Sequence, residues 1–150
     1  MRVTKAIKAE QLRILRELYP NAKPALTFKT PFELLIAVIL SAQCTDVRVN
    51  VVTGRLFQYA NTPEAIAALG QTKLETAIHD CGFFRMKAKH ILETCHILLQ
   101  EYGGEVPADF EALQKLPGVG RKTANVVMSV AFHAPAIAVD THVFRVANRL

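Results

Sequence analysis

Apolar residues recur along most of this chain at the spacing of amphipathic helices. The first such pattern covers residues 5–19, and its apolar face comprises Ile7, Leu12, Ile14, Leu15 and Leu18. Residues 32–42 are apolar nearly all round and predict a buried helix. No pair of segments alternates with the period of paired strands. The pattern therefore predicts an all-α fold, a bundle or barrel of about nine or ten helices joined by short loops.

Capping signals mark where the central helices begin. Thr30, Pro31 and Glu33 have the order of a capping box with proline in the first helical turn, so the buried helix is expected to begin there. A second helix is expected from Thr45 to about residue 59. Its inward-facing residues are expected to be Val47, Val51, Leu56 and Phe57.

Further boundary signals divide the middle of the chain. A short helix from Thr62 is expected to end near Gly70, and Thr72 is expected to cap another helix that reaches about residue 80. A longer amphipathic helix is predicted over residues 85–102, where a Gly-Gly pair ends it. A short helix over residues 109–115 follows.

The segment Leu116–Ala124, LPGVGRKTA, places two glycines in a short loop before a run of helix-forming residues. Gly118 and Gly120 allow backbone angles that a Cβ disfavours, and they permit close approach by another molecule. Such a loop directs backbone N–H groups toward a helix start, which favours an anion such as phosphate. Arg121 and Lys122 lie in that first turn, where cations are unfavourable unless something negative binds. The pattern predicts a phosphate-binding hairpin.

The helix behind the hairpin is expected to cover residues 121–132 as a buried strut. Its apolar residues are Val126, Val127, Met128, Val130, Ala131 and Phe132. An extended return over residues 135–139 leads to a last helix, which Asp140 is expected to cap. Because no stop signal lies near Leu150, we expect the sequence to be part of a longer protein.

Composition and charge give only modest information about the kind of molecule that the protein binds. The formal net charge is +5 and the isoelectric point is about 9.3, which favours an anionic partner. The sequence contains no run of about 18 apolar residues, so no membrane span is predicted, and no signal-peptide core follows the N-terminus. We therefore expect a cytoplasmic protein. Cys44, Cys81 and Cys95 are too far apart for a metal-ligand spacing, and we expect ordinary thiols in or near the core.

Three segments carry a family resemblance. LPGVGRKTA resembles the helix-hairpin-helix of the endonuclease III family of DNA glycosylases. The segments Leu40–Asp46, LSAQCTD, and Val139–Arg145, VDTHVFR, are similar to two other signatures of that family. The resemblance extends from about Phe32 to the last residue, with the three segments in the family's order.

The resemblance implies two helical lobes. Residues 25–133 would form a helical-barrel domain that contains the hairpin, and residues 1–24 and 134–150 would belong to a second helical domain. In the family, that second domain is completed by a C-terminal region in which four cysteines bind a [4Fe–4S] cluster. No such ligand set is present in these 150 residues, so no metal ligand is expected in this chain.

The resemblance assigns the chemistry to Lys122 and Asp140. The lysine amine would attack the sugar C1′ of a damaged nucleotide, and the cations around it favour the neutral amine that attack requires. Asp140 would activate the nucleophile and stabilise the developing sugar cation; an aspartate is also favoured there simply as an N-cap, and both roles can hold at once. Twelve helical residues span about 18 Å and seven extended residues reach about 23–25 Å, so the chain can return Asp140 to Lys122.

Other residues are candidate DNA contacts. Gln43 would fill the gap that an extruded base leaves, and Phe83 stands where the family carries an apolar wedge. His142 would line the pocket mouth. Each has a structural alternative: a solvent-facing glutamine, a core phenylalanine and a helix-start histidine. The hairpin would hold phosphates through Pro117, Gly118, Val119, Gly120, Arg121 and Thr123.

The resemblance therefore implies a bifunctional DNA glycosylase and abasic-site lyase of base excision repair. Its substrate would be oxidised pyrimidines in duplex DNA, and the protein would act as a monomer, associated with the nucleoid if bacterial. An adenine glycosylase of the same superfamily is an alternative, but those enzymes typically lack the hairpin lysine. A non-catalytic helix-hairpin-helix module is another, and it would not need Asp140. A plain helical interaction protein leaves Arg121 and Lys122 unexplained.

Overall fold

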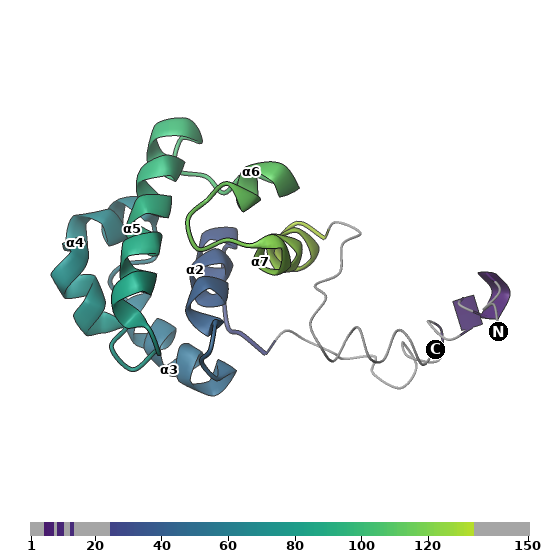
Figure 1. Cartoon of the computed structure of the whole chain (residues 1–150), viewed down its shortest axis with the longest axis horizontal. Helices are drawn as coiled ribbons and strands as arrows, with labels where there is room; N and C mark the ends of the chain where they lie inside the picture. Colours follow the sequence, from purple (N-terminus) through teal and green to yellow (C-terminus); the bar gives the residue numbers. More distant parts are fainter. Residues whose placement is uncertain (1–4, 8, 11–12, 14–24, 134–150) are drawn as a thin grey trace. The chain divides into compact units, whose positions relative to one another are not determined.

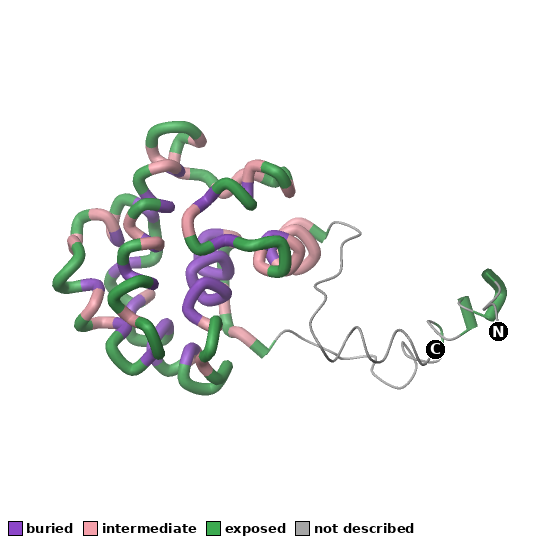
Figure 2. The backbone as a smooth tube through the Cα atoms, in the orientation of Figure 1, coloured by how far each residue is buried: buried purple, intermediate pink, exposed green. Residues whose placement is uncertain are grey.

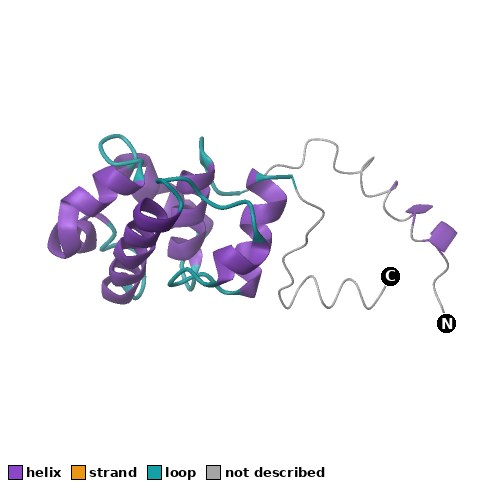
Figure 3. Cartoon of the chain, turned by 90° about the horizontal axis from the view of Figure 1, so that it is seen from above, coloured by secondary structure: helices purple, strands orange, loops and turns teal. Residues whose placement is uncertain are grey.

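The computed structural model describes residues 5–7, 9–10, 13 and 25–133. The chain divides into two units, and residues 25–133 all belong to one of them. Helices and loops, without a strand, make up the described residues (Figure 3), which confirms the all-α prediction. In the other unit the described positions between 5 and 13 are helical, as predicted, and Ile7 is exposed there. The predicted division into two helical domains stays a prediction.

Helix α2 (Pro31–Ser41) is the most deeply buried element of the described fold, and Figure 2 draws its tube almost wholly in the colour of buried residues. Thr30 caps it, because its hydroxyl oxygen accepts a hydrogen bond from the Glu33 amide at 3.1 Å. The expected capping box is only half formed: Glu33 Oε2 is buried and finds no hydrogen-bond partner in the described part of the chain.

Helix α3 (Asp46–Leu56) begins at the predicted cap, Thr45, but faces the core differently from the prediction. Val47 and Val51 are exposed, and the buried apolar side chains are Val49, Val52 and Leu56. The prediction was right for Leu56 and for Phe57, which packs partly buried against the core. It was wrong for Val47 and Val51, because valines alternate with polar residues in the first half of this helix, and that segment by itself does not decide which stripe meets α2. The core contact selected the stripe.

Helix α4 (Pro63–Ala77) consists of two helical stretches that meet at a kink at Gly70, where φ is +78°. The break was predicted there, but Thr72 lies inside the second half and is not an N-cap. Helix α5 (Phe84–Glu101) packs beside α4 (Figure 1) and ends where expected. Its last turn closes through a hydrogen bond from the Gly104 amide to the Leu98 carbonyl at 2.8 Å.

The hairpin comprises helix α6 (Phe110–Gln114), a loop, helix α7 (Arg121–Val126) and a π-helical turn, η1 (Val127–Ala131). The expected strut is therefore not a uniform α-helix. It is also less buried than predicted in this structure, since only Ala124 and Val127 are buried and the other apolar residues of this segment are half-buried.

Helix α2 is the centre of the described fold, because it packs against α3, α5, α7 and η1. Each of these elements buries one apolar stripe on it or beside it. The resulting core includes Leu35, Ile36, Leu40, Val49, Val52, Leu56, Ile66, Leu74, Ile91, Leu98, Leu113, Leu116, Val119 and Val127. The hairpin and the turn after α2 are thus fixed to one framework.

The three cysteines are free thiols, as expected: Cys44 is half-buried, and Cys81 and Cys95 are buried. Burial raises the pKa of Cys95 to about 12, and the charge of Glu64 adds to the shift. Burial, followed by the neighbouring Cys44 thiol, raises the pKa of Cys81 to about 12.

These two thiols predict a loss of stability in alkali. An unfolded thiol loses its proton near pH 9.0, whereas the folded ones keep theirs to about pH 12, so the folded state binds more protons between these values. The free energy of unfolding should therefore fall as pH rises above 9, by about 1.4 kcal/mol per pH unit for each thiol. Urea denaturation of Cys95→Ala should show a shallower fall than wild type. An unchanged slope would contradict this assignment.

Candidate nucleic-acid interface

The hairpin loop is anchored to the hydrophobic core by two of its own apolar residues. Leu116 and Val119 are 3% and 6% exposed, and the Val119 amide donates to the Leu116 carbonyl at 3.1 Å. Gly118 between them has φ of +77°, a conformation that disfavours a side chain. The predicted tight glycine turn is present, and it leaves Gly118 and Gly120 exposed.

Helix α5 holds this loop in place through two residues that were not predicted from the sequence. The buried Thr94 hydroxyl donates to the Pro117 carbonyl at 2.9 Å. A Cβ at Gly118 would lie 3.1 Å from the Cβ of His90, so the loop backbone packs directly on that side chain. His90 and Thr94 are four residues apart and share a helix face, which is the only signal the sequence offered.

The first amide groups of helix α7 lack the capping side chain and the acidic residue that usually stabilise a helix start. Gly120 is the N-cap and supplies no side-chain hydrogen bond, and no acidic residue lies in the first turn. Arg121 and Lys122 occupy that turn and are exposed, and Thr123 is half-buried. Amide N–H groups, a helix dipole and two cations are therefore presented together at the surface, an arrangement that suits an anionic backbone.

Asp140 and His142 lie outside the described residues. The predicted approach of Asp140 to Lys122 therefore stays a prediction, as does the role of His142 at a pocket mouth. The described part of the site consists of the hairpin and the two turns that carry Gln43 and Phe83.

Gln43 and Phe83 are brought into neighbouring turns, although forty positions separate them. Gln43 follows α2 and Phe83 precedes α5, and a Cβ at Gly82 would lie 3.4 Å from the Gln43 carbonyl oxygen. Both are exposed, Phe83 by 67%, and both are non-glycine residues with positive φ, +54° and +56°. Phe83 is thus not a core aromatic, and the turns present an amide and a ring to the outside.

A buried lysine lies beneath these turns. Lys87 is 6% exposed, and its Nζ donates hydrogen bonds to the carbonyls of Leu40, at 2.9 Å, and Ala42. Its position was not predicted from the sequence, yet a signal was present: Lys87 shares the spacing of Ile91 and Cys95 on the apolar face of α5. A charged residue in such a stripe indicates a specific buried contact.

The described residues do not fit an iron–sulfur cluster. No group of three or more His, Cys, Asp or Glu side chains in this part of the chain could hold a metal ion. Cys81 and Cys95 are buried with raised pKa values, whereas cluster ligands are thiolates. No step of the chemistry is therefore assigned to a cluster. No described helix is long and apolar enough to cross a membrane.

A helical framework that carries a glycine hairpin and a basic helix start defines a helix-hairpin-helix protein of the kind that binds a phosphate backbone. The chain belongs to the endonuclease III family within the HhH-GPD superfamily of base excision DNA repair proteins, and the superfamily's sequence pattern matches residues 36–150. The resemblance seen in the three sequence segments is confirmed.

Curated relatives support this assignment. The chain is 54% identical over 147 residues to endonuclease III of Escherichia coli strain K12, an alignment that covers 98% of this chain and 70% of the relative. It is also 54% identical to endonuclease III of Bacillus subtilis strain 168, over 89% of this chain and 61% of the relative.

Solved structures share the fold. A trapped covalent intermediate of an endonuclease III with DNA matches with a TM-score of 0.89 and 52% identity, over 99% of this chain and 70% of that one. A non-covalent endonuclease III–DNA complex matches with a TM-score of 0.88 and 51% identity, over 97% and 68%. A thermostable thymine-DNA glycosylase is 26% identical with a TM-score of 0.84, over 95% and 66%.

Proposed function

We propose that this protein is a bifunctional DNA glycosylase and abasic-site lyase of base excision repair that removes oxidised pyrimidines from duplex DNA. One observation carries the proposal: Lys122 is exposed in the first turn of α7, directly after the glycine loop. An amine there can reach a sugar while the loop amides and Arg121 hold the phosphates on either side. A relative that is 52% identical has been trapped as a covalent intermediate with DNA, which supports a covalent mechanism.

The chemistry assigned to Lys122 proceeds in two stages. The neutral amine attacks C1′ of the damaged nucleotide, the bond from C1′ to the base breaks, and the base leaves with the bonding electrons and takes up a proton. Loss of the sugar-ring C1′–O bond gives a Schiff base between Nζ and C1′. Removal of a proton from C2′ then expels the 3′-phosphate by β-elimination, and water hydrolyses the remaining imine.

Asp140 is proposed to stabilise the positive charge that develops on the sugar and to assist deprotonation of the amine. Gln43 and Phe83 are proposed to occupy the space vacated when the damaged nucleotide leaves the stack. Extrusion costs a few kcal/mol, and side chains that fill the gap offset part of that cost. Their neighbouring, outward positions support this reading.

The partner is proposed to be damaged double-stranded DNA. A monomeric state and a cytoplasmic, nucleoid-associated location stay predictions, and so does a [4Fe–4S] cluster in the full-length family protein. The hairpin lysine argues against an adenine glycosylase, since those enzymes typically lack it.

The test is covalent trapping of the intact protein. Incubation with a duplex that contains one abasic site, together with sodium borohydride, should reduce the Schiff base to a stable protein–DNA adduct that migrates slowly on a denaturing gel. Asp140→Asn should form this adduct more slowly. Salt-sensitive binding without any adduct would contradict the enzyme and support a non-catalytic binding module.

A further inference from the structure

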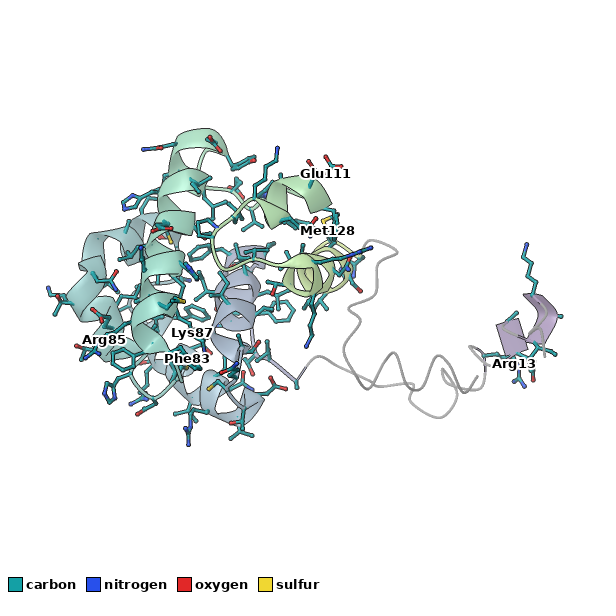
Figure 4. All side chains as sticks on the ribbon, viewed as in Figure 1. Arg13, Phe83, Arg85, Lys87, Glu111 and Met128 are labelled. Atoms are coloured by element: carbon teal, nitrogen blue, oxygen red, sulfur yellow. The ribbon has the colours of Figure 1, made fainter. Side chains whose placement is uncertain are left out.

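We propose that Lys87 is a positioning residue that joins the Gln43 turn to the Phe83 turn, so that both side chains enter the DNA stack as one unit. The inference rests on the proposed function and extends it to a residue with no assigned role. Lys87 itself is buried and would not touch DNA. Figure 4 shows Phe83 and Lys87 near the same end of α5.

Lys87 contacts both turns directly. Its side-chain ammonium donates to the carbonyls of Leu40, at 2.9 Å, and Ala42, and Ala42 precedes Gln43. Its backbone amide donates to the carbonyl of Phe83 at 3.0 Å. A single residue therefore bonds to the neighbour of one candidate DNA contact and to the backbone of the other.

Burying a charged side chain at this position costs free energy, which indicates that the lysine is there for a specific contact. Burial lowers the pKa of Lys87, and the thiols of Cys81 and Cys44 offset part of that shift. No ion pair of Lys87 with a carboxylate occurs within the described residues. An apolar side chain would cost less burial energy here, but it would leave the last carbonyls of α2 without these donors.

The two turns need such a brace because both are held in sparsely populated conformations. Gln43 and Phe83 have φ near +55°, with values of +54° and +56°, and non-glycine residues there store about 1–3 kcal/mol each. The surrounding structure must maintain them. The close approach of Gly82 to the Gln43 carbonyl and the three bonds of Lys87 contribute to this, beside the hydrogen bond from the Cys44 amide to the Ser41 carbonyl at 3.1 Å.

A prearranged pair lowers the cost of extruding a base, because no turn has to be ordered during the step. The effect should therefore differ between two kinds of substrate. A duplex with an intact damaged base must lose stacking and pairing before the amine can attack. A duplex with a preformed abasic site has already lost that base, so it depends less on Gln43 and Phe83.

The experiment uses the intact protein and compares its reaction with these two substrates. The first duplex carries one 5,6-dihydroxylated thymine beside a 2-aminopurine, whose fluorescence rises when stacking is lost. The second carries one abasic site. Base release, fluorescence and strand nicking are measured in single turnovers for wild type, Lys87→Met and Lys89→Met. Lys89 is an exposed lysine of the same helix and serves as the matched control.

Lys87→Met should slow base release about tenfold or more and reduce the fluorescence rise, because two charge-assisted hydrogen bonds are lost. Nicking of the abasic duplex should stay within about twofold, and Lys89→Met should match wild type on both. Adding Gln43→Ala to Lys87→Met should slow base release less than Gln43→Ala slows it in wild type, since Lys87 acts through that turn.

Gly82→Val provides a second route if Lys87→Met does not fold. Its Cβ would be in van der Waals contact with the Gln43 carbonyl oxygen, and its two methyl groups would add bulk between the turns, so the same split between substrates is expected. Equal losses on both duplexes, or unchanged base release, would overturn the inference. If wild type neither releases the base nor nicks the abasic duplex, the proposed function is overturned instead.

Discussion

Replacing Lys122 by alanine is expected to abolish the covalent chemistry while leaving the fold intact. The amine is proposed to be the nucleophile, and nothing else in the first turn of α7 can form a Schiff base, since a guanidinium such as that of Arg121 is always protonated. Base release and nicking should each fall by about a thousandfold or more. The borohydride adduct should disappear, which a denaturing gel would show.

The control for this change is Lys115→Ala. Lys115 is exposed at the end of α6, in the same hairpin, so its loss removes one positive charge without touching the proposed nucleophile. It should weaken DNA binding slightly and in a salt-dependent way, with the adduct retained. Both variants should unfold within about 0.5 kcal/mol of wild type, because both lysines are exposed. An adduct that persists in Lys122→Ala would place the nucleophile elsewhere.

Gly118→Ala is expected to destabilise the hairpin by about 2–3 kcal/mol and to weaken DNA binding at least tenfold. The added Cβ would occupy a backbone conformation with φ of +77° and would lie 3.1 Å from the Cβ of His90. That atom is attached directly to the backbone of α5 and cannot move away as a long side-chain end can. The loop amides would then shift from the positions that suit a phosphate.

Gly120→Ala is the matched control for folding. Gly120 has an ordinary extended backbone, and no atom lies within 4 Å of a Cβ built there. Its alanine variant should cost less than about 1 kcal/mol, the typical loss when glycine at an N-cap becomes alanine. Thermal unfolding and a fluorescence-anisotropy titration with an abasic duplex would measure both variants. Equal stability of Gly118→Ala and Gly120→Ala would refute the packing argument.

The hairpin shows how far local sequence can lead. Its glycines and the cations after them are short-range signals, and the structure has the turn and the start of α7 that they predicted. The support beneath the loop was not predictable in the same way. Thr94 reaches Pro117 across 23 positions, and a threonine in an amphipathic helix does not reveal its distant acceptor.

Helix α3 illustrates the opposite case. Its start at Thr45 was predicted, because a cap depends on the residues next to it. Its buried face was not, because Val47, Val49, Val51 and Val52 offer more than one apolar stripe. Packing against α2 buried Val49 and Val52 and left Val47 exposed by 76%. The choice between stripes is a tertiary one.

By itself, the sequence determined the helical class, the positions of most caps and the family to which the chain belongs, since each depends on residues close together or on a shared pattern. Only the tertiary structure decided which faces are buried and that Gln43 and Phe83 occupy adjoining turns. It also decided that Lys87 joins those turns. The physical reason is that a cap is satisfied within one helical turn, whereas a buried donor must find its acceptor on another element.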